Sequence, residues 1–250
     1  MTGKLYVIGV GPGDPELMTL KAVRILKEVF CVFVPKGREE GSSLALSIVR
    51  GAVSLDGKKI VELHFPMMKT APHPSPLPTG EREVSQAEDL NAKWNEAVHA
   101  IVSVLEQGMD VAFITIGDPG IYSTFFYLYD KLLERRPEFV IEIVPGISSI
   151  NAAAARAGLY LGLGNDRIAI LPANYLDSLE ETLEKFDTVV LMKVNKVFGT
   201  VREQLNKMNR LASATFVVRA GMDDERVYKD ISQIHEKDLN YFSLMIVRKR

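Results

Sequence analysis

Three turns combine glycine with proline and a polar or acidic residue directly after an apolar run. They are Gly-Pro-Gly-Asp at residues 11–14, Gly-Asp-Pro-Gly at residues 117–120 and Pro-Gly-Ile-Ser-Ser at residues 145–149. Glycine allows a positive φ or a close approach of the backbone to a ligand. Turns after parallel strands share the carboxyl edge of the sheet, where open α/β sheets bind small molecules. One such turn could simply end a strand, but three of them, two with Gly-Asp, favour a binding site.

The first turn does not fit a dinucleotide. The fingerprint G-x-G-x-x-G requires a small sixth residue, and that position is Asp14. The acidic residue that would bind a ribose about 20 residues further on is also missing, since Val34 and Pro35 stand there. Asp14 and Asp118 would repel a pyrophosphate. The residues therefore favour a cationic or zwitterionic ligand with a purine-like ring.

The elements that must position these turns alternate between strands and helices, which predicts a mostly parallel sheet. Strands are expected near residues 4–10, 29–34, 59–64, 110–115 and 140–145, and helices near 19–28, 42–50, 88–107, 123–135 and 148–157. The glycine-rich, aperiodic stretch at 158–166 predicts a domain boundary. We therefore expect two α/β domains, residues 1–164 and 165–250.

The second domain is expected to hold a mixed sheet. Its predicted strands lie near 167–172, 187–192, 214–219, 226–230 and 241–248, with helices near 177–185 and 197–208. The last two strands leave no room for a crossover helix, so part of this sheet should be antiparallel. Residues 66–87 hold five prolines and little apolar periodicity. They predict a flexible surface insert, with a proline-recognition ligand as the alternative.

Composition narrows the class of protein. A net charge of −2 gives no basic footprint for nucleic acid. No apolar run is long enough for a membrane span, and the first residues do not resemble a signal peptide. The single cysteine, Cys31, suits a reducing cytoplasm. The four histidines are scattered without the spacing of metal ligands, so we expect no metal site.

Taken together, the motifs resemble the tetrapyrrole methylases. The likeness is carried by residues 10–22, by 116–119 with Tyr-Ser-Thr at 122–124, and by 144–149. It continues through 170–173, 191–193 and 220–222, and so covers nearly the whole chain outside the proline-rich segment. Residues 34–42 and 148–158 further resemble the branch that methylates precorrin-2, or its cobalt form, at C20.

This resemblance implies a two-domain class III methyltransferase that binds S-adenosyl-L-methionine in a cleft between its domains. It implies that the methionine and ribose end meets Ile116, Gly117 and Asp118 and that the adenine is held by the second domain. The implied cofactor-binding residues are Ile116, Gly117, Asp118, Ile121, Ser148, Ser149, Ala173, Met192, Ala220 and Gly221. A homodimer is also expected, because the family is commonly dimeric.

The substrate side follows from the same resemblance. The turn Gly11, Pro12, Gly13 and Asp14 would shape the tetrapyrrole trough. The substrate's carboxylates need cations, for which Lys36, Arg38 and Arg156 are candidates. Family members that act on uroporphyrinogen carry an aspartate at the end of the second strand, where this chain has Pro35, which makes that substrate less fitting.

The methylation at C20 suggests one catalytic residue, and two other functions are compatible with the sequence. C20 must lose a proton, and Tyr122 is the candidate polar group near it, with a packing aromatic as the alternative. One rival is a methyltransferase of the same fold acting on a protein or RNA group. The other is a nucleotide-binding module without catalysis. The residues do not distinguish the metal-free from the cobalt-bearing macrocycle.

Overall fold

The computed structural model describes residues 2–37, 43–65, 81–175 and 178–249. The chain forms two compact units, Met1–Ile147 and Ser148–Arg250. The sequence placed the boundary at 164–165, whereas the helix α5 (Ser149–Ala157) lies in the second unit because it packs against two strands of that unit's sheet.

The first unit is built on a five-stranded sheet that is parallel throughout, as predicted. Its order is β3-β2-β4-β1-β5. The strands are β1 (Leu5–Gly9), β2 (Cys31–Lys36), β3 (Lys59–His64), β4 (Val111–Thr115) and β5 (Ile141–Val144). Because all five run the same way, the turns that follow β1, β4 and β5 leave from one edge, and these three strands are neighbours.

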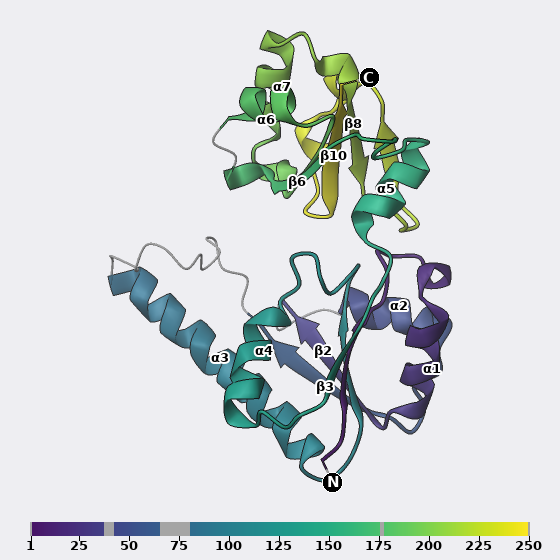
Figure 1. Ribbon diagram of the computed structural model, residues 1–250, viewed down its shortest axis with the longest axis vertical. Helices are drawn as coiled ribbons and strands as arrows, with labels where there is room; N and C mark the ends of the chain where they lie inside the picture. Colours follow the sequence, from purple (N-terminus) through teal and green to yellow (C-terminus); the bar gives the residue numbers. More distant parts are fainter. Residues whose placement is uncertain (1, 38–42, 66–80, 176–177, 250) are drawn as a thin grey trace. The chain divides into compact units, whose positions relative to one another are not determined.

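Two pairs of helices cover the two faces of this sheet (Figure 1). α1 (Leu20–Glu28) and α2 (Leu44–Ala52) lie on one face, and α3 (Glu81–Leu105) and α4 (Phe126–Arg135) lie on the other. Each face has its own apolar core, with Ile25 and Val49 on the first side and Ile101 and Leu128 on the second. Cys31 is buried in the core on the α3 side.

The predicted insert 66–87 is shorter at its carboxyl end than expected. α3 begins at Glu81, so residues 81–87 are helical, and residues 66–80 lie outside the described residues. The last proline of the stretch is Pro78, and the following segment is rich in glutamate, arginine, glutamine and alanine, which favour helix. The lack of apolar periodicity up to residue 87 was therefore a poor guide to the end of the insert, because the helix begins soon after the last proline.

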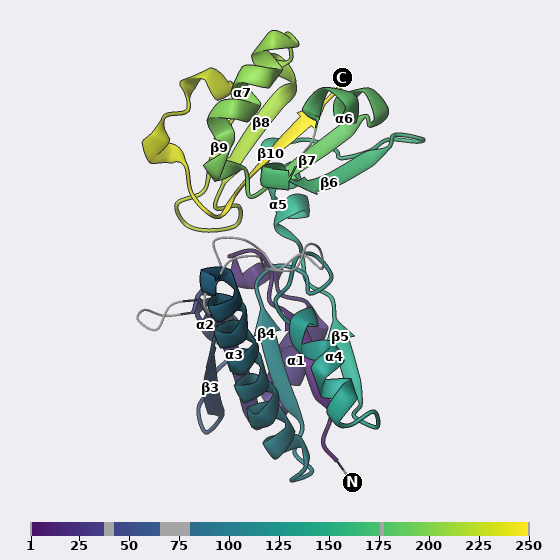
Figure 2. The same cartoon turned by 90° about the vertical axis from the view of Figure 1, so that its left-hand side faces the viewer.

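The second unit holds a mixed five-stranded sheet in the order β6-β7-β10-β8-β9 (Figure 2). Its strands are β6 (Ile168–Pro172), β7 (Thr188–Met192), β8 (Ala214–Val218), β9 (Arg226–Tyr228) and β10 (Ser243–Arg248). β6 and β7 are parallel, while β10 lies antiparallel between β7 and β8. The antiparallel part was predicted, but β9 pairs with β8 rather than with β10.

Helices α6 (Leu179–Lys185) and α7 (Phe198–Lys207) pack over one face of this sheet. α5 contacts β8 and β10. Serine side chains start two of these helices: Ser178 accepts the backbone N–H of Glu181 and Ser148 accepts that of Asn151. Such caps satisfy backbone donors that a helix leaves without partners. Gly158, with a φ of +69°, ends α5 in the left-handed conformation.

One ion-pair cluster ties the first unit together beside its edge strand. The Glu142 carboxylate on β5 binds Lys21 of α1 at 2.5 Å and also binds Lys4 at the start of β1. The hydrogen bonds from the two lysines lower the pKa of Glu142 from 4.5 to about 2. A lowered carboxyl pKa stabilises the folded state above the unfolded value, and this stabilisation is lost as the pH falls through the folded value.

Replacing this carboxylate should therefore have a pH-dependent effect. We expect Glu142→Gln to lower the melting temperature at neutral pH, with the difference shrinking below pH 4.5 and disappearing near pH 2. Glu28→Gln is the control, because Glu28 pairs with Arg24 on an exposed helix surface and such pairs contribute little. An equal loss at neutral and acidic pH would mean that the ion pairs do not stabilise the fold.

Candidate functional site

The turns after β1 and β4 are joined by backbone hydrogen bonds at the carboxyl edge of the first sheet. The N–H of Gly117 donates to the carbonyl of Gly11 at 2.8 Å, and the N–H of Val10 donates to the carbonyl of Thr115 at 2.9 Å. Gly11 has a φ of +81° and Gly117 a φ of +73°. Both positions lie in the left-handed region, which favours glycine. The structure thus brings together two of the three turns that the sequence singled out.

A second set of contacts brings in the turn after β5. A Cβ atom on Gly146 would lie 2.3 Å from the carbonyl oxygen of Gly117, and one on Gly9 would lie 2.6 Å from the same oxygen. Real Cβ atoms do not approach so closely. Gly146 is therefore required by close packing rather than by a positive φ. Three strand ends converge on one carbonyl group.

The Asp118 carboxylate links the turn after β4 to the turn after β5. Its Oδ2 accepts the N–H of Gly146 at 3.0 Å, and its Oδ1 accepts the N–H of Gly120 at 2.8 Å. Each oxygen keeps a further lone pair, so the group can still accept from a ligand. Asp118 thus holds the β4 and β5 turns together and places a negative charge at this edge.

The other predicted site residues of the β4 turn lie within a few residues of Asp118 in the chain. Ile116 and Ile121 are half-buried, and Ile121 N–H closes the turn by donating to the Asp118 carbonyl at 3.2 Å. Tyr122 is half-exposed and has a φ of +53°, which is uncommon for a bulky residue. Partial burial raises the pKa of its phenol, so the group is neutral at physiological pH.

The substrate-side candidates take different positions. Gly11 and Pro12 are buried and Gly13 is half-buried. Asp14 accepts the N–H of Glu16 at 2.9 Å and so caps a short 3₁₀ turn, η1 (Pro15–Leu17). Lys36, at the end of β2, pairs with Glu62 at 2.8 Å. Arg38 lies outside the described residues.

The candidates of the second unit also share a sheet edge. Pro172, at the end of β6, is in register with Met192, at the end of β7, and Met192 is in register with Leu244 of β10. Ser243, next to Leu244, is in register with Val218, the last residue of β8. Ala173 follows β6 directly in the sequence and Ala220 follows β8 after Arg219, so both lie at the sheet edge where Met192 ends β7. Ala173 and Ala220 are buried.

The start of α5 holds the last two candidates. Ser148 is buried, and its hydroxyl caps the helix and donates to the Asn151 side chain at 2.6 Å. Ser149 is the first helical residue and is half-buried. Ser148 thus has a structural task in the second unit, which is compatible with the additional binding role implied for it.

Backbone strain lies next to three of the predicted cofactor-binding residues. Four described residues other than glycine have a positive φ, and three of them are Tyr122, Lys193 and Arg219. Each directly follows or precedes a predicted cofactor-binding residue, namely Ile121, Met192 and Ala220. Strained conformations persist where the surrounding structure imposes them, and they are concentrated at functional sites. This observation supports the predicted turns independently of the motifs.

Sequence reasoning missed one residue of the second edge. The Glu225 carboxylate accepts the N–H of Gly221 at 2.6 Å and the Nε–H of Arg156 at 2.5 Å. The signal was the acidic run Asp223-Asp224-Glu225, one residue after Ala220-Gly221. Arg156, predicted to bind the substrate, is thus paired with a carboxylate within its own unit.

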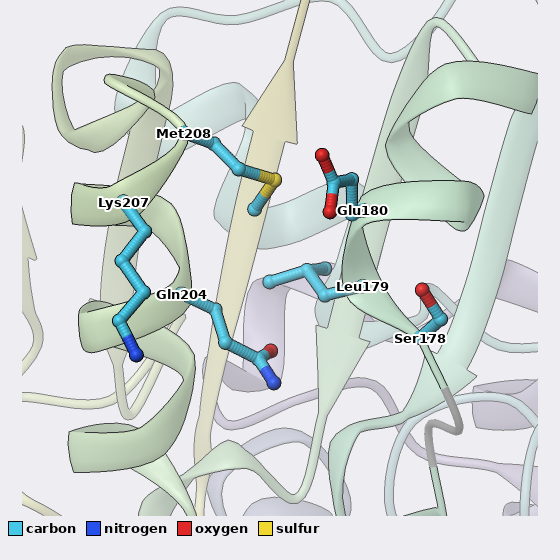
Figure 3. A pocket seen from close by; sticks show the side chains of 6 residues that line it. All are labelled: Ser178, Leu179, Glu180, Gln204, Lys207 and Met208. Atoms are coloured by element: carbon cyan, nitrogen blue, oxygen red, sulfur yellow. The ribbon is translucent and has the colours of Figure 1, made fainter.

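A surface groove elsewhere on the second unit holds none of the predicted residues. It lies between α6 and α7 and is lined by Ser178, Leu179, Glu180, Gln204, Lys207 and Met208 (Figure 3).

Among the described residues, no group of three or more histidine, cysteine, aspartate and glutamate side chains could hold a metal ion. Within the same part of the chain, no helix has the length and apolar character needed to cross a membrane.

Comparison with known proteins identifies the family. Residues 4–234 match the model of the Tetrapyrrole (Corrin/Porphyrin) Methylases, and the chain belongs to this family. It is 32% identical to the cobalt-precorrin-2 C(20)-methyltransferase of Salmonella typhimurium, over 100% of this chain and 98% of the relative. It is 37% identical to a Methanocaldococcus jannaschii protein named a probable cobalt-precorrin-2 C(20)-methyltransferase, over 98% of this chain and 96% of the relative.

A solved structure agrees on the fold. Uroporphyrin-III C-methyl transferase from Thermus thermophilus, crystallised with S-adenosyl homocysteine, has a TM-score of 0.60 to this chain at 21% identity. The match covers 99% of this chain and 98% of the other. The class III methyltransferase fold predicted from the motifs is confirmed.

The convergence of the three strand ends can be tested through one methyl group. We expect Gly146→Ala to destabilise the protein by about 1–3 kcal/mol, the usual range for overpacking, because its Cβ would collide with the Gly117 carbonyl. Gly199→Ala is the matched control. Gly199 lies on the exposed side of α7 with no atom within 4 Å of an added Cβ, so that change should stabilise the helix. Equal melting temperatures for the two variants would contradict the close packing.

Proposed function

We propose that this chain transfers a methyl group from S-adenosyl-L-methionine to C20 of precorrin-2, giving precorrin-3, in corrin ring biosynthesis. The cobalt-bearing form of the substrate is favoured. The observation that carries the proposal is the identity of 32% and 37% to relatives with that name over essentially the whole chain. The names of these relatives do not favour the two rivals, a protein or RNA methyltransferase and a non-catalytic module.

The reaction makes few acid–base demands on the protein. S-adenosylmethionine, when bound, supplies a methyl group on a positively charged sulfur, and its transfer leaves neutral S-adenosylhomocysteine. The C20 carbon provides the electron pair of the new bond and afterwards loses a proton. Placing the reacting atoms in line is therefore the main task of the chain, and orientation alone can contribute about 7–11 kcal/mol.

The residues of the first unit fit the charge and size of this cofactor. The backbone of Ile116, Gly117 and Gly146 presents polar groups beside glycines that carry no side chain to obstruct a ligand. Asp118 adds a negative charge, which suits a ligand that bears a sulfonium and an ammonium group. The edge formed by β6, β7 and β8 in the second unit offers Ala173, Met192, Ala220 and Gly221, which we propose contact the adenine. Ile121, Ser148 and Ser149 complete the proposed set.

For the substrate, we propose contacts from the first turn, Gly11 to Asp14, and from Lys36 and Arg38. The Glu62 carboxylate offsets the positive charge of Lys36, and a substrate carboxylate would have to share or displace that partner. Cobalt, where present, enters as part of the substrate.

Tyr122 is the proposed polar group near the departing proton. Because burial raises the pKa of its phenol, the group is not a phenolate base at neutral pH. We therefore propose that it donates a hydrogen bond to the macrocycle and leaves proton removal to solvent.

We also propose a homodimer in the cytoplasm. The single cysteine, buried on β2, is compatible with a reducing compartment. Light scattering of the purified protein would give twice the mass of the chain for a dimer, and the mass of one chain would contradict this part of the proposal.

The function itself is tested by separate substrates. Purified protein is mixed with methyl-labelled S-adenosylmethionine and with precorrin-2, cobalt-precorrin-2 or RNA, and the products are analysed by mass spectrometry. We expect one added methyl group on the tetrapyrrole, at C20. Label on RNA or on protein alone would favour the first rival, and cofactor binding without any transfer would favour the second.

The charge of Asp118 should matter for cofactor affinity. We expect Asp118→Asn to weaken S-adenosylhomocysteine binding by about 1.5–3 kcal/mol, the range for hydrogen bonds to charged groups, because it also disturbs the two backbone bonds. Calorimetry measures the affinity, with Asp130→Asn on the exposed face of α4 as control. Unchanged affinity in Asp118→Asn would remove this residue from the site.

Tyr122 can be tested by removing only its hydroxyl. We expect Tyr122→Phe to lower kcat by about tenfold, as the loss of one hydrogen bond of about 1.4 kcal/mol would do, without changing S-adenosylhomocysteine affinity. Tyr127→Phe is the control, since Tyr127 stacks on Trp94 with ring centroids 4.9 Å apart. A normal kcat in Tyr122→Phe would leave packing as the role of this ring.

A further inference from the structure

The segment after β8 is folded into a compact turn by a series of short-range bonds. Met222 N–H donates to the carbonyl of Arg219 at 2.9 Å, and Glu225 N–H donates to the carbonyl of Met222 at 3.0 Å. Arg219 forms an ion pair with Asp224 and donates its own N–H to the carbonyl of Phe242 at 2.6 Å. The turn is strained at Arg219, which has a φ of +55°, while Gly221 adopts a φ of +78° that glycine tolerates.

Glu225 fixes this turn to the rest of the second unit. Its side chain is only 10% exposed and reaches back to the N–H of Gly221 at 2.6 Å. Its other oxygen accepts from Arg156 of α5 at 2.5 Å. A carboxylate that is largely withdrawn from water is stabilised by such charge-assisted bonds. Arg156 therefore balances the charge that holds Gly221 in place.

We propose that Glu225 is a positioning residue for nucleoside binding, and that Arg156 acts through it as the counter-ion. This inference rests on the proposed function, in which Ala220 and Gly221 contact the adenine. Because the N–H of Gly221 already donates to Glu225, the nucleoside forms its hydrogen bonds with the other backbone groups of the turn. Their direction depends on the positive φ values of Arg219 and Gly221, which we propose Glu225 and Arg156 maintain.

This proposal assigns Arg156 a different task from binding a substrate carboxylate. If Arg156 acts through Glu225, its removal weakens cofactor binding. If it binds the tetrapyrrole, its removal raises the KM for that substrate and leaves cofactor affinity unchanged. Measuring cofactor affinity and the KM for the tetrapyrrole in an Arg156 variant therefore distinguishes the two roles.

The test uses the full chain and S-adenosylhomocysteine as the probe. We expect Glu225→Gln to weaken binding by about tenfold in calorimetry, while kcat at saturating cofactor stays within about twofold of the wild type. Amide hydrogen exchange of the peptide covering residues 219–225 should become faster in the unliganded variant. Asp223→Asn is the matched control, because it removes one exposed charge from the same turn.

A double-mutant cycle with Arg156→Gln completes the test. The affinity losses of Glu225→Gln and Arg156→Gln should be strongly non-additive, because either change breaks the same link. Wild-type affinity in Glu225→Gln, or fully additive losses, would overturn the inference alone. A wild-type protein that does not bind S-adenosylhomocysteine would overturn the proposed function and the inference together.

Discussion

The contact among Gly9, Gly117 and Gly146 is the constraint on which the proposed binding residues of the first unit depend. The carbonyl of Gly117 occupies the space that a side chain would need on either of the other two glycines. Side chains are thereby excluded where three parallel strands end side by side. The same packing allows Asp118 to reach the N–H of Gly146 and fixes the turns relative to one another. Polar backbone groups and one carboxylate are thus held in place before any ligand binds, which is how a site that works by orientation should be built.

In the second unit, the proposed binding residues lie beside backbone strain rather than beside close-packed glycines. Lys193 and Arg219 adopt left-handed conformations at the ends of β7 and β8, at a cost of about 1–3 kcal/mol each. In the β8 turn, the ion pairs of Asp224 and Glu225 offset part of that cost. In this turn, the charged residues therefore shape the backbone. This explains why a chain of nearly neutral net charge can present well-defined polar edges.

Much of this arrangement could be predicted from the sequence, because strand ends and glycine turns are local signals. All ten strands were expected close to their observed positions, and the convergence of the turns after β1, β4 and β5 followed from the parallel order. The partners of charged side chains could not be predicted, since they depend on long-range packing. Arg156 and Glu225 are separated by 69 residues in the sequence, and Lys36 and Glu62 by 26. The start of α3 was also missed, because lack of apolar periodicity was taken to mean lack of helix.

A crystal structure of the full chain with S-adenosylhomocysteine would test the central claim most directly. The account predicts that the homocysteine and ribose end contacts the backbone of Ile116 and Gly117 and the Asp118 carboxylate, with the Gly117 and Gly146 backbones unmoved. A nucleoside bound away from these turns, for example in the groove between α6 and α7, would contradict it. So would a turn after β5 that separates from Gly117 when the ligand binds.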